Sequence, residues 1–123
     1  MLDDDRREKE FQDWLLLVLE RLTWDAGAQL DYIDELGVGP DELALEFDDA
    51  LHTVRARAAD GSVPVTMSDV DAHLDEMTRQ GPDAWTELSM RTSPEWSALR
   101  VLARTALIEL RETFGVRDRS REG

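Results

Sequence analysis

Cysteine is absent from the 123-residue sequence, which excludes disulfide bonds, thiolate metal ligands and cysteine nucleophiles. Long apolar runs are also absent. The run WLLLVL at residues 14–19 is far shorter than the about 20 apolar residues that a membrane-spanning helix needs. The chain begins MLDDDRREKE, which is acidic where a secretory leader is basic. We therefore expect a cytoplasmic protein that does not bind membranes.

Sequence signatures of catalysis are lacking as well. No serine stands in a Gly-x-Ser-x-Gly turn, and GVGP at residues 37–40 lacks the spacing and the lysine of a phosphate-binding loop. We therefore expect a protein that is not an enzyme and that carries no cofactor.

Histidine is scarce, with two in the chain, and each lies one helical turn from a carboxylate. His52 follows Asp49 by three residues, and His73 precedes Glu76 by three. Metal sites in helical bundles use two Glu-x-x-His motifs and two further glutamates in core positions. Because this chain offers one Asp-x-x-His and one His-x-x-Glu, we expect two ordinary histidines and no metal site.

What is present is the composition of a globular protein, with 41% hydrophobic and 34% charged residues. Helix start and stop signals recur along the chain, and no stretch alternates polar and apolar residues as a strand does. The sequence predicts an all-α fold, a compact single-domain bundle of five or six helices whose first and last helices are the longest. We expect the domain to span residues 1–115 and residues 116–123 to form a disordered tail.

The first three helices are predicted from acidic residues, glycine and proline near their ends. The first is predicted over about residues 4–24, and a short second one ends at Gly37. GPDE at residues 39–42 opens the third, with Gly39 as its N-cap and Pro40 at its first position.

The last three helices are marked by serine caps and Gly-Pro-Asp. Ser68 and Asp71 resemble a capping box that opens the fourth helix. Gly-Pro-Asp at residues 81–83 opens the fifth. Ser93 caps the last, with Pro94 at its first position, and that helix runs to about residue 114 or 115.

The first and last helices carry more apolar residues than one buried stripe requires. On a helical wheel, the outliers of the first helix lie beside its main stripe, and the last helix has a second apolar row. These residues are Leu16, Leu17, Trp24, Val101 and Ile108. Such residues either pack within a bundle as part of its central helices or form the interface with a partner or a second copy of the chain.

Acidic residues dominate the chain, whose net charge is −14, and they are unevenly placed. Residues 1–50 carry a net charge of −12, and residues 91–123 carry +2. Between Arg21 and Arg55 there are nine carboxylates and no basic residue. This excess argues against direct binding of nucleic acid, which needs basic residues.

Two interpretations of this acidic block stay open. It is either a solvated face, partly neutralised by Arg100, Arg104 and Arg111 of the last helix, or a binding surface for a basic partner. The residues proposed for that surface are Asp31, Asp34, Glu35, Asp41, Glu42, Glu46, Asp48 and Asp49.

The sequence favours a non-catalytic interaction protein that presents an acidic helical surface to a basic protein, as an immunity protein, antitoxin or regulator does. The alternative is a helical homodimer with a structural or small-ligand-binding role, in which the acids only keep the protein soluble. The apolar outliers of the first and last helices would then form the dimer interface.

Overall fold

The computed structural model describes residues 2–115, except for the side chain of Leu2. These residues form six α-helices and one 3₁₀-helix, and the described part of the chain contains no strand. The elements are α1 (Leu2–Thr23), α2 (Ala26–Leu36), α3 (Glu42–Arg57), α4 (Val65–Gln80), η1 (Pro82–Trp85), α5 (Glu87–Thr92) and α6 (Pro94–Thr113). The predicted all-α fold is therefore confirmed, with the first and last helices the longest. The tail predicted at residues 116–123 lies outside the described residues.

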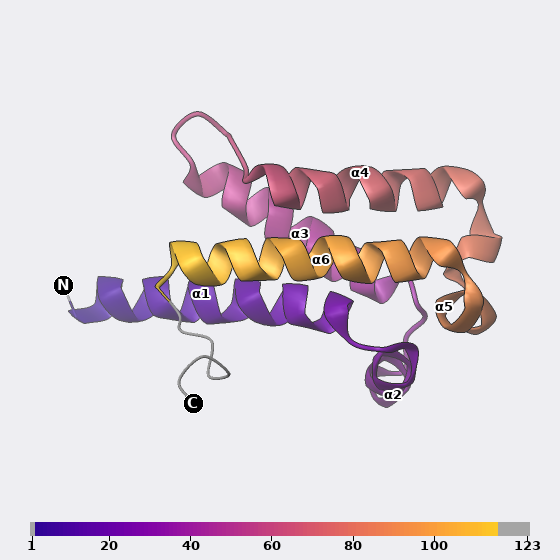
Figure 1. The fold of residues 1–123 in the computed structure, drawn as a ribbon. Helices are drawn as coiled ribbons and strands as arrows, with labels where there is room; N and C mark the ends of the chain where they lie inside the picture. The colour runs from indigo at the N-terminus through magenta and orange to yellow at the C-terminus, as the bar shows by residue number, and fades with distance from the viewer. Residues whose placement is uncertain (1, 116–123) are drawn as a thin grey trace, which may run out of the picture.

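Four long helices form a ring in which each packs against the next in sequence and the last packs against the first. The ring runs α1, α3, α4, α6 and back to α1, and consecutive helices point in opposite directions (Figure 1). The short α2 and α5 contact each other at one end of the bundle, whereas α1 begins and α6 ends at the other (Figure 1). This arrangement is an up-down-up-down four-helix bundle with two short helices closing one end.

The core fills the space between the four long helices with side chains predicted from the helical wheels. Its buried members on α1 and α6 are Leu15, Val18, Leu19, Leu22, Trp96, Leu99, Ala103, Ala106, Leu107 and Leu110. Trp14 lies at the edge of the buried stripe of α1 and stays 37% exposed. None of the helices in residues 2–115 is apolar over enough of its length to cross a membrane.

Several helix ends follow from the predicted capping residues. Gly37 ends α2 in the left-handed region, at φ 72°, where a glycine pays no Cβ penalty. The Ser93 hydroxyl accepts a hydrogen bond from the Trp96 amide at 3.2 Å, and Pro94 begins α6 as expected.

Two helix starts, those of α3 and α4, differ from the prediction. α3 begins at Glu42 rather than at Pro40, because the Glu42 amide closes a turn onto the Gly39 carbonyl at 3.1 Å. The capping box predicted at Ser68 is wrong, because α4 already begins at Val65. There the carbonyl of Pro64 accepts the first bonds of the helix, including one from the Ser68 amide at 3.1 Å.

The predicted fifth helix is divided into η1 and α5. Thr86 lies between them in an extended conformation, with ψ at 159°. Its hydroxyl then caps α5 by accepting a hydrogen bond from the Ser89 amide at 3.1 Å. The two short helices therefore turn the chain from the end of α4 to the start of α6.

Candidate functional site

The predicted acidic residues lie on α2, on the α2–α3 connection and on α3. Six of them are exposed, namely Asp31, Asp34, Glu35, Asp41, Asp48 and Asp49, and Glu42 is half-buried. We call these seven residues the acidic surface. Their distribution follows from the helices, since each lies away from the buried stripe of its own helix.

Glu46 differs from the other predicted acids because it points into a contact between three helices. Its carboxylate accepts a hydrogen bond from the Tyr32 hydroxyl of α2, and its Oε1 lies 3.5 Å from a guanidinium nitrogen of Arg21 on α1. The Arg21 guanidinium also lies over the Tyr32 ring, 4.5 Å from its centre. Glu46 therefore holds the helices together, and we leave it out of the acidic surface.

The same contact changes the acidity of Tyr32. Burial, the hydrogen bond to Glu46 and the negative charge of that carboxylate together raise the pKa of Tyr32 to about 12. All three causes favour the neutral hydroxyl, so Tyr32 stays a hydrogen-bond donor at neutral pH.

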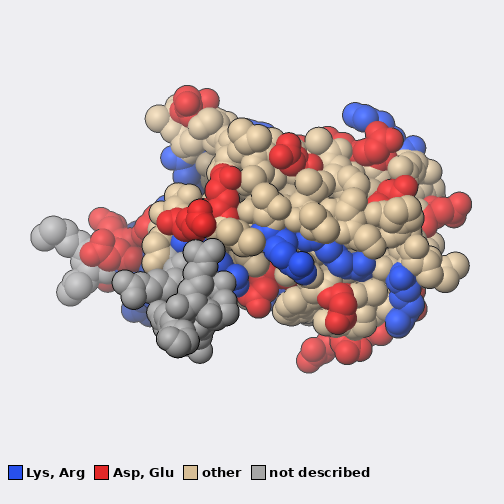
Figure 2. Space-filling view, in the orientation of Figure 1, with Lys and Arg blue, Asp and Glu red and all other residues tan. Residues whose placement is uncertain are grey.

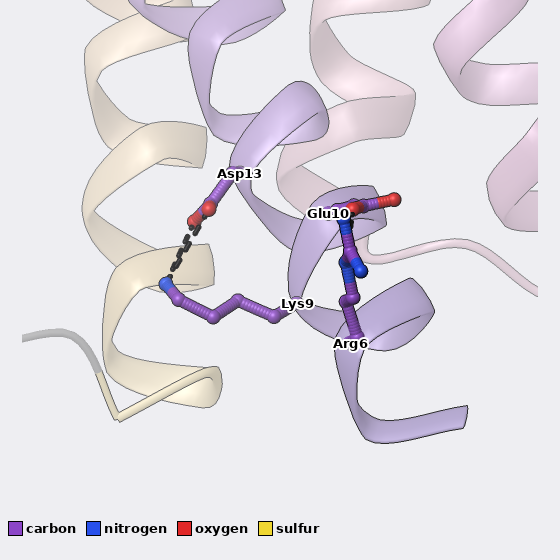
Figure 3. Close-up of polar contacts among 4 residues, drawn as sticks. All are labelled: Arg6, Lys9, Glu10 and Asp13. Atoms are coloured by element: carbon purple, nitrogen blue, oxygen red, sulfur yellow. Dashed lines mark hydrogen bonds and ion pairs between the residues drawn. The ribbon is translucent and has the colours of Figure 1, made fainter. Parts of the chain in front are cut away.

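The carboxylates of the acidic surface lack basic neighbours. Among the described residues, none of the seven has a lysine or arginine nitrogen within 4.0 Å. Asp48 alone has a titratable partner, since one carboxylate oxygen lies 3.6 Å from Nδ1 of His52. The acids at the start of α1 are different: Arg6 pairs with Glu10 at 3.2 Å and Lys9 with Asp13 at 3.3 Å (Figure 3).

Arg100, Arg104 and Arg111 do not pair with the acidic surface in the described part of the chain. Arg100 is half-buried and donates hydrogen bonds to Oε1 of Gln29 at 2.9 Å and to the Met90 carbonyl at 2.8 Å. Burial lowers the pKa of Arg100, and the negative charge of Asp25 partly offsets this shift.

Figure 2 shows a row of basic side chains along the middle of the face formed by α1, α4 and α6. Arg100, Arg104 and Arg111 form no ion pairs with the acidic surface among the described residues, although partial neutralisation of the acidic block was expected from them.

Three large apolar side chains are exposed within the acidic segment and were not predicted from the sequence. Leu45 is 54% exposed, Leu36 52% and Val38 38%. Leu45 lies on α3 opposite the buried side chains of Leu43 and Phe47. The sequence signal was present, because Leu45 falls off the apolar stripe of its helix and between two pairs of acids.

Negative charge also extends from α3 to the neighbouring α4. Asp71 on α4 is half-buried, and its pKa is raised first by burial and then by the nearby charges of Asp75 and Asp48. Arg55 and His52 act in the opposite direction. The carboxylates on the α3 side of the bundle therefore repel one another as well as being unpaired.

The apolar outliers predicted as an interface are not gathered into one patch. Leu16 is half-buried against the core, and Trp24 packs edge-on against Tyr32 with ring centres 6.1 Å apart. Leu17 is 39% exposed and lies one turn before Arg21, on the side of α1 next to α3. Val101 and Ile108 are 61% and 47% exposed on the outside of α6.

The two histidines have separate surroundings. His52 is exposed on α3, with Nδ1 2.9 Å from the Asp48 carbonyl. His73 is half-buried between α4 and α6, with Nε2 2.8 Å from the Glu95 carbonyl. Within residues 2–115, no three side chains of the metal-binding types are grouped so that they could hold a metal ion.

The acidic segment therefore presents carboxylates without basic neighbours among the described residues, and four of them lie one turn from the exposed Leu45 of α3. Comparison of the chain with protein-family models, with curated proteins and with solved structures gives no match.

Proposed function

We propose that the chain is a non-catalytic cytoplasmic interaction protein that binds a basic protein through the acidic surface. An immunity protein, an antitoxin or a regulator of a cationic protein works in this way. The observation that carries the proposal is the set of seven carboxylates on α2 and α3 without a basic neighbour among the described residues. Such a set repels itself in the free protein and is relieved when a cationic surface covers it.

The mechanism is electrostatic steering followed by charge-assisted contacts. A field of one sign accelerates the encounter with a basic protein, and arginine–carboxylate pairs then fix the orientation of the complex. Because exposed charges are screened by salt, association is expected to weaken steeply as the salt concentration rises.

The test uses affinity purification from a lysate of the source cells with two charge variants of equal net charge. The first neutralises four carboxylates of the acidic surface: Asp31→Asn, Asp34→Asn, Glu42→Gln and Asp48→Asn. The control neutralises four exposed carboxylates elsewhere: Asp5→Asn, Asp69→Asn, Asp83→Asn and Glu112→Gln. We expect the wild type and the control to retain the same basic protein and the first variant to lose it.

Salt elution completes this test. The retained protein is expected to elute as the salt concentration increases. A partner that stays bound at high salt, or that binds the first variant as well as the wild type, would contradict the proposal.

A second candidate function is a homodimer with a structural or ligand-binding role. It is favoured by the exposure of Val101 and Ile108, which lie two turns apart on the outside of α6. Light scattering during size-exclusion chromatography tests it. This candidate requires a dimer that dissociates in the Ile108→Glu variant, and a monomer at high protein concentration excludes it.

A further inference from the structure

We propose that the partner of the acidic surface is an amphipathic basic helix, and that one of its apolar side chains docks on Leu45. This inference rests on the proposed function and adds the chemistry of the partner to it. It is carried by the exposure of Leu45 and by the carboxylates around it.

Leu45 is surrounded by carboxylates on its own helix. Asp41 and Glu42 lie one turn before it, and Asp48 and Asp49 lie one turn after it. Residues three and four positions apart are neighbours on a helix surface. The side chain is 54% exposed, so a partner can cover it without displacing any part of the bundle. A face of this kind has an apolar centre and a rim of negative charge.

The exposed apolar residues of α6 lack such a rim. Val101 is followed one turn later by Arg104 and Thr105, and Ile108 by Arg111 and Glu112. Their surroundings are basic or mixed and do not specify the charge of a partner. The carboxylates around Leu45 therefore indicate that a partner covering this side chain carries positive charge.

Leu36 at the end of α2 and Val38 in the α2–α3 connection are further exposed apolar side chains of the acidic segment. Leu36 lies one turn after Tyr32, whose hydroxyl bonds to Glu46, the residue that follows Leu45. Val38 is held in place by a hydrogen bond from its amide to the Ile33 carbonyl at 3.0 Å. The apolar side chains are therefore offered by an ordered part of the chain, next to the start of α3.

A helix matches this surface better than a second copy of the chain. An amphipathic helix places basic residues three and four positions from an apolar one, which is the spacing of the acids around Leu45. In a symmetric dimer a second copy would bring its own carboxylates against the same face, and like charges in contact oppose binding.

The experiment measures the binding of two labelled peptides by fluorescence anisotropy. The first is a designed helix of about 18 residues, long enough to fold on binding, with leucines on one face and lysines and arginines on either side. The second has the same composition, but its order is permuted so that the leucines no longer share a face. The protein is used as wild type, as Leu45→Ala and as Val101→Ala. Both substitutions replace exposed helical residues with alanine, which helices tolerate.

We expect the helical peptide to bind the wild type in a salt-dependent manner and more tightly than the permuted peptide. Leu45→Ala is expected to weaken its binding by about tenfold, the effect of losing one buried leucine contact, and Val101→Ala is expected to leave it unchanged. Equal binding of both peptides, or equal binding by the wild type and Leu45→Ala, overturns the docking of a helix but agrees with the proposed function. Failure of both peptides to bind at low salt overturns both.

Discussion

Tyr32 reports on the contact between α1, α2 and α3 because it is the single tyrosine of the chain. Its hydroxyl donates to Glu46, and the Arg21 guanidinium lies over its ring. Neither partner is near Tyr32 in sequence, so the sequence could not distinguish Glu46 from the exposed acids on the same helix. Seven of the eight predicted surface acids have no such inward contact, since the wheel places them away from the buried stripes.

The first prediction concerns the ionisation of Tyr32. Its pKa is raised to about 12, so the ultraviolet signal of the phenolate should develop well above the usual pH range of tyrosine. Between about pH 10 and 12 the native state holds a proton that the unfolded state has lost, so the free energy of unfolding falls as the pH rises. A spectrophotometric titration of the folded protein checks the pKa.

Two variants provide the controls for this titration. In Glu46→Gln the carboxylate charge beside the hydroxyl is removed, so the pKa of Tyr32 should move down towards about 10. Asp49→Asn removes a charge from the exposed side of the same helix and should leave the pKa of Tyr32 nearly unchanged. A wild-type titration near the ordinary value would show that the contact is not formed in solution.

At the level of helices, Gln29 links the end of α1, the start of α2 and α6. It is fully buried, and its amide donates to the carbonyls of Arg21 and Leu22 at 3.0 and 3.2 Å. Those carbonyls lie in the last turn of α1, where the helix itself provides no donors, and the Arg21 carbonyl also accepts a hydrogen bond from the Trp24 amide at 3.3 Å. The side-chain carbonyl of Gln29 accepts from Arg100, so one side chain joins three elements.

The second prediction is that Gln29→Leu lowers the free energy of unfolding by about 2–3 kcal/mol. The change leaves the buried Leu22 carbonyl and part of the half-buried Arg100 guanidinium without partners, although the Trp24 amide still donates to the Arg21 carbonyl and Met90 still accepts from Arg100. Chemical denaturation measures the effect. The control is Gln80→Leu at the exposed end of α4, which should change stability by less than about 0.5 kcal/mol. Similar values for the two variants would show that the Gln29 hydrogen bonds contribute little.

Helix positions were predictable where a local signal decides them. Ser93, Pro94 and Gly37 act through their own caps or backbone, and the structure places them as expected. The start of α4 depends on Pro64, and it was not predicted because Ser68 and Asp71 resemble a capping box and indicated a later start. The burial of Gln29 was not predictable, because it depends on Arg100 from a distant part of the chain. Leu45 was overlooked because a single exposed leucine is ordinary on a protein surface.

At the scale of the whole molecule, charge opposes the fold that the apolar core supports. The net charge is −14, and most of it belongs to the first 50 residues. Arg57 of α3 pairs with Glu8 and lies over the Phe11 ring, so cations do join helices near the start of α1. At the other end of the bundle the acidic surface has no such partner among the described residues. Repulsion should therefore be concentrated on α2 and α3.

The third prediction is that salt stabilises the protein and that the acidic surface causes most of the effect. Screening shortens from about 10 Å at 0.1 M salt to about 3 Å at 1 M, which weakens repulsion between exposed carboxylates. The melting temperature should therefore rise by a few degrees as sodium chloride is added, which circular dichroism can follow.

The two charge variants of equal net charge decide where this repulsion lies. If it is local, neutralising Asp31, Asp34, Glu42 and Asp48 should raise the melting temperature at low salt and reduce its further rise with salt. Neutralising Asp5, Asp69, Asp83 and Glu112 should do so much less. Equal responses would mean that net charge alone matters, and the acidic surface would then have no stored repulsion for a basic partner to relieve. A local response would show that the free protein keeps a destabilising charge cluster that binding of a cation can offset.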